Sequence, residues 1–135
     1  MKKVIKNLVC LVGVLCLVGS ALAATTTTFY VNGVKINGKL TYVYNNDINP
    51  FTKDSVTAKT TSVAAMDRIE ARATIAYYEG SVRKTTSDSG YATNARSKSI
   101  TVKASGIGNG STGSGEHYAS HNGLSHKGYT NVIFQ

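Results

Sequence analysis

Hydrophobic and polar residues alternate one by one over residues 69–78, which read I-E-A-R-A-T-I-A-Y-Y. Glu70, Arg72 and Thr74 occupy one parity of this segment, and apolar residues occupy the other. Successive side chains of a β-strand point to opposite faces, so the alternation predicts a strand with one buried and one exposed face. The residues predicted to be buried are Ile69, Ala71, Ala73, Ile75 and Tyr77.

The same segment is also compatible with an amphipathic helix. Ala65, Ile69 and Ala73 recur at helical spacing, and Gly80 stands where a C-terminal cap would be. We prefer the strand because the preceding segment, residues 55–65, contains five β-branched residues. Such residues lose side-chain freedom in a helix.

Three Asn-Gly pairs mark turns, because Asn and Gly tolerate the positive φ angles of a two-residue hairpin turn. Only three residues separate Asn32-Gly33 from Asn37-Gly38, so both cannot easily be tight turns. We predict that the second pair is the main turn, which pairs residues 29–36 with residues 39–44. The first pair is then a bulge or kink. The third pair, Asn122-Gly123, predicts a hairpin near the end of the chain.

Further strand signals follow at intervals of roughly ten to fifteen residues. Glu79-Gly80 predicts a turn, residues 98–104 predict a strand, and the Gly/Ser-rich residues 105–115 predict a flexible loop. About seven short strands are expected in total. This spacing is typical of an antiparallel β-sandwich or a small barrel, and we predict a single all-β sandwich domain.

The N-terminus has the features of a secretory signal peptide over residues 1–23. Lys2, Lys3 and Lys6 precede an apolar run at residues 8–18, and residues 20–23 end in the A-x-A pattern that signal peptidase cleaves. The apolar run is shorter than the ~20 residues of a transmembrane helix. We therefore expect a secreted, extracellular domain over residues 24–135. A retained membrane anchor is the alternative.

Cysteine content limits the chemistry expected of this domain, and its charge indicates the class of partner. Both cysteines, Cys10 and Cys16, lie inside the predicted signal, so neither disulfides nor thiol chemistry are expected beyond it. Twelve of the 15 Lys and Arg residues lie beyond residue 23, against all seven Asp and Glu residues. This balance favours anionic envelope polymers and lipid headgroups as partners; the alternative is that it only maintains solubility. No basic run is interleaved with aromatic residues, so we expect no nucleic-acid partner.

Three histidines surround the third Asn-Gly pair. If Asn122-Gly123 is a two-residue hairpin turn, the three side chains project from one face, and His126 lies diagonal to the other two. Converging imidazoles can bind zinc or copper, and no other cofactor is expected. The alternatives are three solvated histidines, or a pH switch in which the imidazoles become charged in acid. The candidate metal ligands are His117, His121 and His126.

Tyrosine is the commonest aromatic residue, with eight tyrosines against three phenylalanines. An exposed tyrosine beside Arg or Lys can stack on a sugar ring or anchor at a lipid interface. The alternative is that the tyrosines fill half-buried positions of the sheet. The candidate ligand-binding residues are Tyr78, Tyr118, Tyr129, Arg83 and Lys84.

Catalytic patterns are missing from the sequence. The carboxylates occur singly, and Glu70 shares a strand face with Arg72, so an ion pair explains both. There is no G-x-S-x-G motif, and the Gly-rich segment is not followed by the Lys-Ser/Thr of a phosphate-binding loop. We expect no enzymatic activity.

The chain resembles the lactococcin-type secreted bacteriocin families. The resemblance is carried by residues 55–65 and 69–80, with their Ser/Thr/Ala-rich alternation, and by residues 117–129, which are rich in His, Gly and Tyr. It implies a β-sandwich that acts outside the cell, with a cell-wall precursor as the target suggested by the best-known type. The chain differs from that pattern in having no Trp and in carrying an additional N-terminal hairpin.

These observations predict a secreted, non-enzymatic protein that binds the bacterial cell envelope. The more specific prediction is that it is a bacteriocin-like effector. Two alternatives belong to other classes. One is an extracellular structural protein that self-associates through exposed sheet edges, for which the uncharged residues 25–31 are a candidate donor strand. The other is a metal-binding protein that uses the three histidines.

Overall fold

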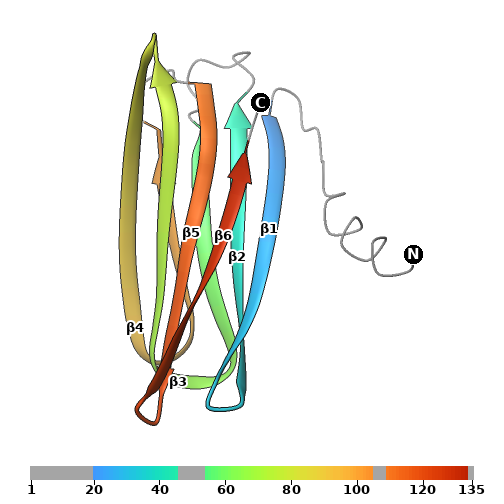
Figure 1. Cartoon of the computed structure of the whole chain (residues 1–135), viewed down its shortest axis with the longest axis vertical. Coiled ribbons are helices and arrows are strands. Elements are labelled where there is room, and N and C mark those ends of the chain that lie inside the picture. Colours follow the sequence, from blue (N-terminus) through green and yellow to red (C-terminus); the bar gives the residue numbers. More distant parts are fainter. Residues whose placement is uncertain (1–19, 46–53, 105–108, 134–135) are drawn as a thin grey trace, which may run out of the picture.

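The computed structural model describes residues 20–45, 54–104 and 109–133, which form six antiparallel strands (Figure 1). The antiparallel all-β prediction is confirmed, and residues 69–78 form strand rather than helix. The expectation of about seven short strands is wrong for the described residues, because two strands are 25 and 22 residues long. The strands are β1 (Ser20–Val31), β2 (Val34–Asn45), β3 (Ser55–Glu79), β4 (Val82–Lys103), β5 (Asn109–His121) and β6 (Leu124–Ile133).

The sheet is arranged around β3. β4 pairs with β3 on both sides of a register shift, whereas the first part of β3 pairs with β2 and its second part pairs with β5. β2 and β5 therefore share the edge of β3 that β4 does not occupy. The strand order is β1-β2-β3-β5-β6, with β4 attached to β3.

The long β3–β4 hairpin bends over on itself. The pairing register shifts between Thr61 and Met66 of β3, and Asn94 of β4 takes a φ of 48° in the same region. Figure 1 shows the two parts of β3 joined by a curved segment at the bottom of the view. Because both strands continue through the bend, they form one nearly closed, barrel-like sheet rather than the two separate sheets of the predicted sandwich.

The two end strands of the sheet approach each other and complete the enclosure. The ring of Phe29 on β1 lies 5.6 Å, centre to centre, from the ring of His126 on β6. A Cβ placed on Gly128 of β6 would lie 2.6 Å from Cδ1 of Phe29, so only glycine leaves room for that ring. Side-chain packing thus joins β1 to β6.

The interior is filled by the alternating apolar residues of the strands. The five residues of β3 predicted to be buried are each at most 2% exposed, which confirms that part of the pattern. They pack in two clusters with apolar side chains of β1, β2, β4 and β5, including Leu40, Tyr42 and Val102. Each fully buried large side chain contributes roughly 1.5–3 kcal/mol relative to leaving it exposed.

Part of the segment expected to be a flexible loop belongs to this packed interior. Residues 109–115 lie in β5, where Gly113 and Gly115 are buried; residues 105–108 lie outside the described residues. A Cβ on Gly113 would lie 2.9 Å from side-chain atoms of both Tyr42 and Val56. The glycines here make room for bulky side chains on facing strands, whereas the sequence pattern had suggested chain flexibility.

The first two Asn-Gly pairs do not have the roles predicted for them. Asn32-Gly33 is the tight turn between β1 and β2, with φ angles of 49° and 77° and Val31 paired with Val34. Asn37-Gly38 lies inside β2, where Gly38 is buried. The prediction that Asn37-Gly38 is the main turn is therefore wrong, and the reason is a packing requirement at Gly38 described below. Asn122-Gly123 forms the predicted two-residue turn between β5 and β6.

The predicted signal peptide overlaps the start of β1. Its first 19 residues lie outside the described residues, and residues 20–23 pair with residues 42–45 of β2. Cleavage before Ala24 would remove those four pairs and leave β1 to begin at Ala24. The described residues contain no helix of the length and hydrophobicity needed to cross a bilayer.

Candidate functional site

One outer face of the barrel carries charged side chains and tyrosines in rows that cross four strands. This face, called the mixed face below, consists of the outward side chains of β5, β6, the second part of β3 and the first part of β4. Its central row is formed by residues that are directly paired on neighbouring strands. From β4 to β6 this row is Tyr91, Glu70, Tyr118 and Lys127.

The next row along the strands has the complementary arrangement. Arg72 of β3 is paired with Ser89 of β4 and with Glu116 of β5, and Glu116 is paired with Tyr129 of β6. Side chains that are directly opposite or diagonal on one sheet face are within reach of each other. The two rows therefore place acids, bases and phenols together on a single surface.

Ion pairs connect these side chains loosely. Arg68 pairs with Glu70, and the Arg68 guanidinium carbon lies 4.0 Å from the centre of the Tyr91 ring. Arg72 Nη1 lies 4.0 Å from Glu116 Oε1. The expected Glu70–Arg72 ion pair is not formed, because Glu70 pairs with Arg68 and Arg72 pairs with Glu116. Exposed ion pairs of this kind contribute about 0–1 kcal/mol, so a ligand can rearrange them at small cost.

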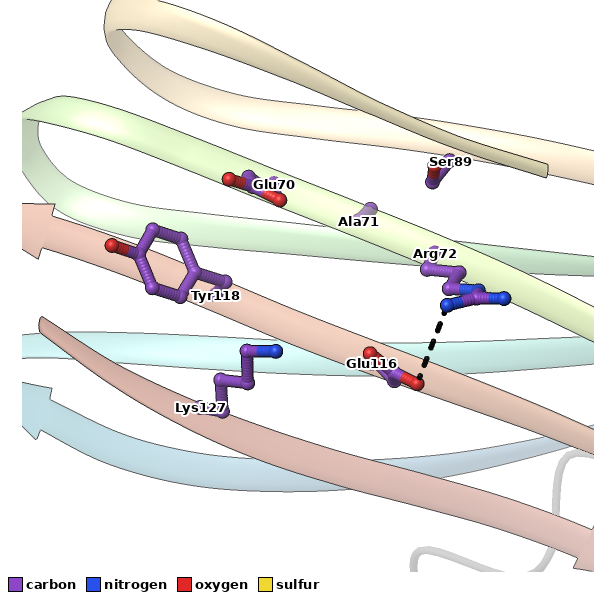
Figure 2. A pocket seen from close by; sticks show the side chains of 7 residues that line it. All are labelled: Glu70, Ala71, Arg72, Ser89, Glu116, Tyr118 and Lys127. Atoms are coloured by element: carbon purple, nitrogen blue, oxygen red, sulfur yellow. Dashed lines mark ion pairs between the residues drawn. The ribbon is translucent and has the colours of Figure 1, made fainter.

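A depression of about 170 Å³ lies between the two rows. Figure 2 shows that its charged and aromatic side chains come from β3, β5 and β6, with the Arg72–Glu116 pair at one side and the Tyr118 ring at the other. Carboxylate acceptors and cationic donors thus surround one aromatic ring. That combination suits a ligand with many hydroxyl groups and an apolar ring face. The lining residues are Glu70, Ala71, Arg72, Ser89, Glu116, Tyr118 and Lys127.

The five predicted ligand-binding residues fall into two groups. Tyr118 is half-buried beside the depression, and Tyr129, which is 61% exposed, lies diagonal to it. Tyr78 and Arg83 are directly paired at the far end of the β3–β4 hairpin. Tyr78 lies eight positions after Glu70, the partner of Tyr118, and this corresponds to ~27 Å along a strand. The fifth residue, Lys84, is on the same hairpin end and pairs with Glu79.

Lys127 and Glu116, which were not among the predicted ligand-binding residues, could have been found from the hairpin register alone. With Asn122-Gly123 as the turn, Lys127 falls opposite Tyr118, and Tyr129 falls opposite Glu116. By contrast, the neighbours of Glu70 on β5 depend on pairing between β3 and β5, which are adjacent in the sheet but separated along the chain by the whole of β4. No local sequence signal specifies that pairing.

His117, the first of the three predicted metal ligands, is fully buried and engaged at both ring nitrogens. Thr60 Oγ1 donates to the carbonyl of Glu70 at 2.7 Å, so its single proton is used there. Thr60 Oγ1 must then accept from Nδ1–H of His117, at 2.9 Å. Nε2 is left as an acceptor for the hydroxyl of Thr130, also at 2.9 Å. Burial lowers the pKa of His117 to about 4, so the imidazole is neutral at physiological pH.

The other two histidines have separate surroundings. His121 is half-buried, with Nδ1 3.5 Å from Oδ1 of Asp67. His126 is exposed and lies beside the Phe29 ring. His121 is paired with Leu124 across the two-residue turn. Within the described residues, no group of three His, Cys, Asp or Glu side chains is arranged to hold a metal ion, so the structure does not bring the predicted trio together.

Comparison with known proteins adds no family assignment. No family model, curated protein or solved structure matches the chain. The lactococcin-type resemblance therefore has only residues 55–65, 69–80 and 117–129 behind it, and we infer function from the geometry of the mixed face.

Proposed function

We propose that this protein is a secreted, non-enzymatic protein that binds the bacterial cell envelope through its mixed face. The ligand class that fits is a hydroxyl-rich polymer, such as a cell-wall glycan, lying across β3, β5 and β6. The sheet holds these strands side by side, so the site is formed before the ligand arrives, and little ordering cost is added on binding.

The observation that supports this proposal is the row formed by Glu70, Tyr118 and Lys127. The Tyr118 ring provides a flat apolar surface, and Glu70 and Lys127 on either side provide an acceptor and a donor for hydroxyl groups. The neighbouring Arg72–Glu116 pair extends the same arrangement along the strands. An extended polymer can therefore make repeated contacts with successive rows.

Sedimentation with isolated Gram-positive cell walls, stripped of their anionic phosphate polymers so that only the glycan remains, tests the proposal. We expect the wild-type domain to sediment with the walls, and Tyr118→Ala to lose at least ~10-fold in affinity, as removal of a central aromatic anchor does. The matched control is Tyr30→Ala, which removes an exposed tyrosine on β1, outside the mixed face. Equal binding by wild type and Tyr118→Ala would contradict the proposal.

The lactococcin-type resemblance extends the proposal to a bacteriocin-like effector whose target is a cell-wall precursor. Addition of the purified domain to growing Gram-positive cells tests this extension. Growth arrest that Tyr118→Ala abolishes is the expected result. Wall binding without any effect on growth would reject the effector role and leave the binding role in place.

A second candidate function is self-assembly through a sheet edge. Among the described residues, the 22-residue β4 pairs only with β3, so one long strand edge is not used by the sheet. Such an edge is a template for strand addition. The donor segment predicted from sequence, residues 25–31, instead pairs with β2 and buries Phe29 and Val31. Size-exclusion chromatography at rising concentration tests assembly, and a strictly monomeric protein would contradict it.

A further inference from the structure

Among the described residues, the exposed acidic side chains are confined to one half of the barrel. Residues 20–45, 55–65 and 95–103 build one half, and these segments contain no Asp or Glu. Apart from Asp54, which is 2% exposed, every acidic residue in the described part of the chain lies in the other half. Negative charges that look scattered along the sequence are therefore segregated by the fold, whereas positive charges occur in both halves.

Four lysines lie on the outer face of the acid-free half. We call this surface the lysine face. Lys35 and Lys39 come from β2, Lys59 from β3 and Lys103 from β4, and all four are exposed. They alternate with the buried residues of their strands, for example Leu40 beside Lys39, so all four point outward.

The centre of the lysine face is a directly opposed pair of like charges. Lys39 and Lys59 are cross-strand partners. Like charges directly opposite each other on a sheet face are unfavourable. Their other cross-strand neighbours are Thr26 and Ser99, so no carboxylate neutralises the pair from an adjacent strand. An anion bound between the two ammonium groups would remove this repulsion.

The remaining two lysines extend the charge along the face in opposite directions. Lys35 lies four residues from Lys39 along β2, and Lys103 lies four residues from Ser99, the partner of Lys59, along β4. Four strand residues span ~13 Å, so the row crosses the face obliquely over ~27 Å. The anion that matches it is extended and carries charge at intervals.

Hydroxyl groups cover the surface between the lysines. Thr57 Oγ1 and Thr101 Oγ1 are hydrogen-bonded to each other at 2.7 Å, and Thr28 Oγ1 donates to Oδ1 of Asn37 at 3.0 Å. Hydroxyls both donate and accept, so they can bind the polyol units between successive phosphates. Further outward hydroxyl groups belong to Thr26, Thr41, Thr61 and Ser99.

We propose that the lysine face binds an extended polyol-phosphate polymer of the envelope, with phosphates between Lys39 and Lys59 and at Lys35 and Lys103. A lipid surface fits less well, because interfacial binding uses apolar and aromatic anchors and the centre of this face has hydroxyl groups instead. Single-stranded nucleic acid fits less well, because its bases stack on aromatic platforms. Tyr30, opposite Lys35, is an aromatic side chain at one end of the row only. The proposal concerns a second surface and does not depend on the mixed face.

Binding of purified glycerol-phosphate teichoic acid, measured at several salt concentrations, tests the proposal. Neutralising a phosphate releases condensed counterions, so the slope of log affinity against log salt reports the number of lysines engaged. We expect Lys39→Gln/Lys59→Gln to weaken binding at least ~10-fold at low salt and to reduce that slope by about half. The charge-matched control, Arg83→Gln/Lys84→Gln, changes two exposed cations at the β3–β4 hairpin end, in the other half of the barrel, and keeps the wild-type slope.

Several outcomes would overturn the proposal. An equal loss in both double variants would show that net charge alone attracts the polymer. Tighter binding to phosphatidylglycerol vesicles or to single-stranded DNA than to teichoic acid would assign the face to those partners. Tyr118→Ala is expected to keep full teichoic acid binding, so failure of this site and failure of the mixed-face proposal are distinguishable. Circular dichroism of each variant establishes that it is folded.

Discussion

His117 on β5 packs its imidazole ring directly against the backbone of Gly38 on β2, so a Cβ at position 38 would overlap the ring atoms Cγ and Cδ2. The same ring is hydrogen-bonded to Thr60, in the first part of β3, and to Thr130 on β6. One buried side chain thus connects strands from both halves of the barrel. The absence of a side chain at Gly38 is what permits these contacts.

Gly38→Ala should therefore destabilise the fold although its backbone needs no unusual φ angle. The added methyl group displaces the His117 ring from both of its threonine partners. Overpacking a filled core typically costs about 1–3 kcal/mol, and loss of the hydrogen bonds adds to this. We expect a decrease of about 3 kcal/mol in the free energy of unfolding, measured by urea denaturation.

A double variant tests whether Gly38→Ala destabilises the fold through its contact with the His117 ring. In a His117→Ala background the methyl group at position 38 meets no ring, so Gly38→Ala should cost less than ~1 kcal/mol there. Lys35→Ala, at an exposed position of the same strand, is the control for the single change. A cost for Gly38→Ala that is unchanged by His117→Ala would show that the ring contact is not its cause.

The buried imidazole also predicts a pH dependence of stability. The pKa of His117 is lowered from 6.5 to about 4 by burial, so the unfolded chain binds a proton at a higher pH than the folded chain does. The free energy of unfolding therefore falls as the pH falls from 6.5 to about 4, by about 3 kcal/mol from this residue. Above pH 6.5 the residue is neutral in both states and contributes no slope.

The measurement is urea denaturation of wild type and His117→Gln at a series of pH values. Because carboxylates titrate in both proteins, the difference between the two stabilities isolates the histidine. We expect His117→Gln to be less stable at pH 7 and the gap to narrow toward pH 4. A gap that stays constant across this range would contradict the role assigned to the buried ring.

The sequence was sufficient to predict the local features of the fold. The alternation over residues 69–78 identified the buried side of β3, and Asn122-Gly123 identified the β5–β6 turn with its register. Both features depend on neighbours within a few residues, where strand periodicity and the φ angles of a turn act directly.

Long-range packing determined the features that the sequence left open. Asn37-Gly38 has the composition of a turn, but Gly38 is needed to receive a ring from β5, nearly eighty residues away along the chain. The bend between Thr61 and Met66 likewise contains no strong turn residue, so no local signal marked its position. The face shared by Lys39 and Lys59 emerges only when β2 pairs with β3.

The Asn32-Gly33 turn predicts a cost that comes from the backbone alone. Gly33 has a φ of 77°, and no atom lies within 4 Å of a Cβ placed there. Gly33→Ala should therefore lose about 1 kcal/mol, because L-residues disfavour this region, while Gly33→Asn should lose less, since Asn tolerates it. Thermal unfolding monitored by circular dichroism measures both. Equal losses for Ala and Asn would indicate a cause other than the φ angle.

The opposed Lys39–Lys59 pair predicts that a single charge reversal stabilises the protein. Lys59→Glu replaces a repulsive cross-strand pair with an attractive one, and such pairs contribute roughly 0.2–1 kcal/mol each, so we expect a gain of about 1 kcal/mol. The gain should shrink in 1 M salt, where the Debye length is only ~3 Å. Lys103→Glu makes the same change in net charge but lies opposite Ser55, so it should stabilise less. If Lys103→Glu gave an equal gain in stability, the cause would be the lower overall positive charge and not the removal of the Lys39–Lys59 repulsion. If Lys59→Glu gave none, the unfavourable contact inferred at the centre of the lysine face would not exist.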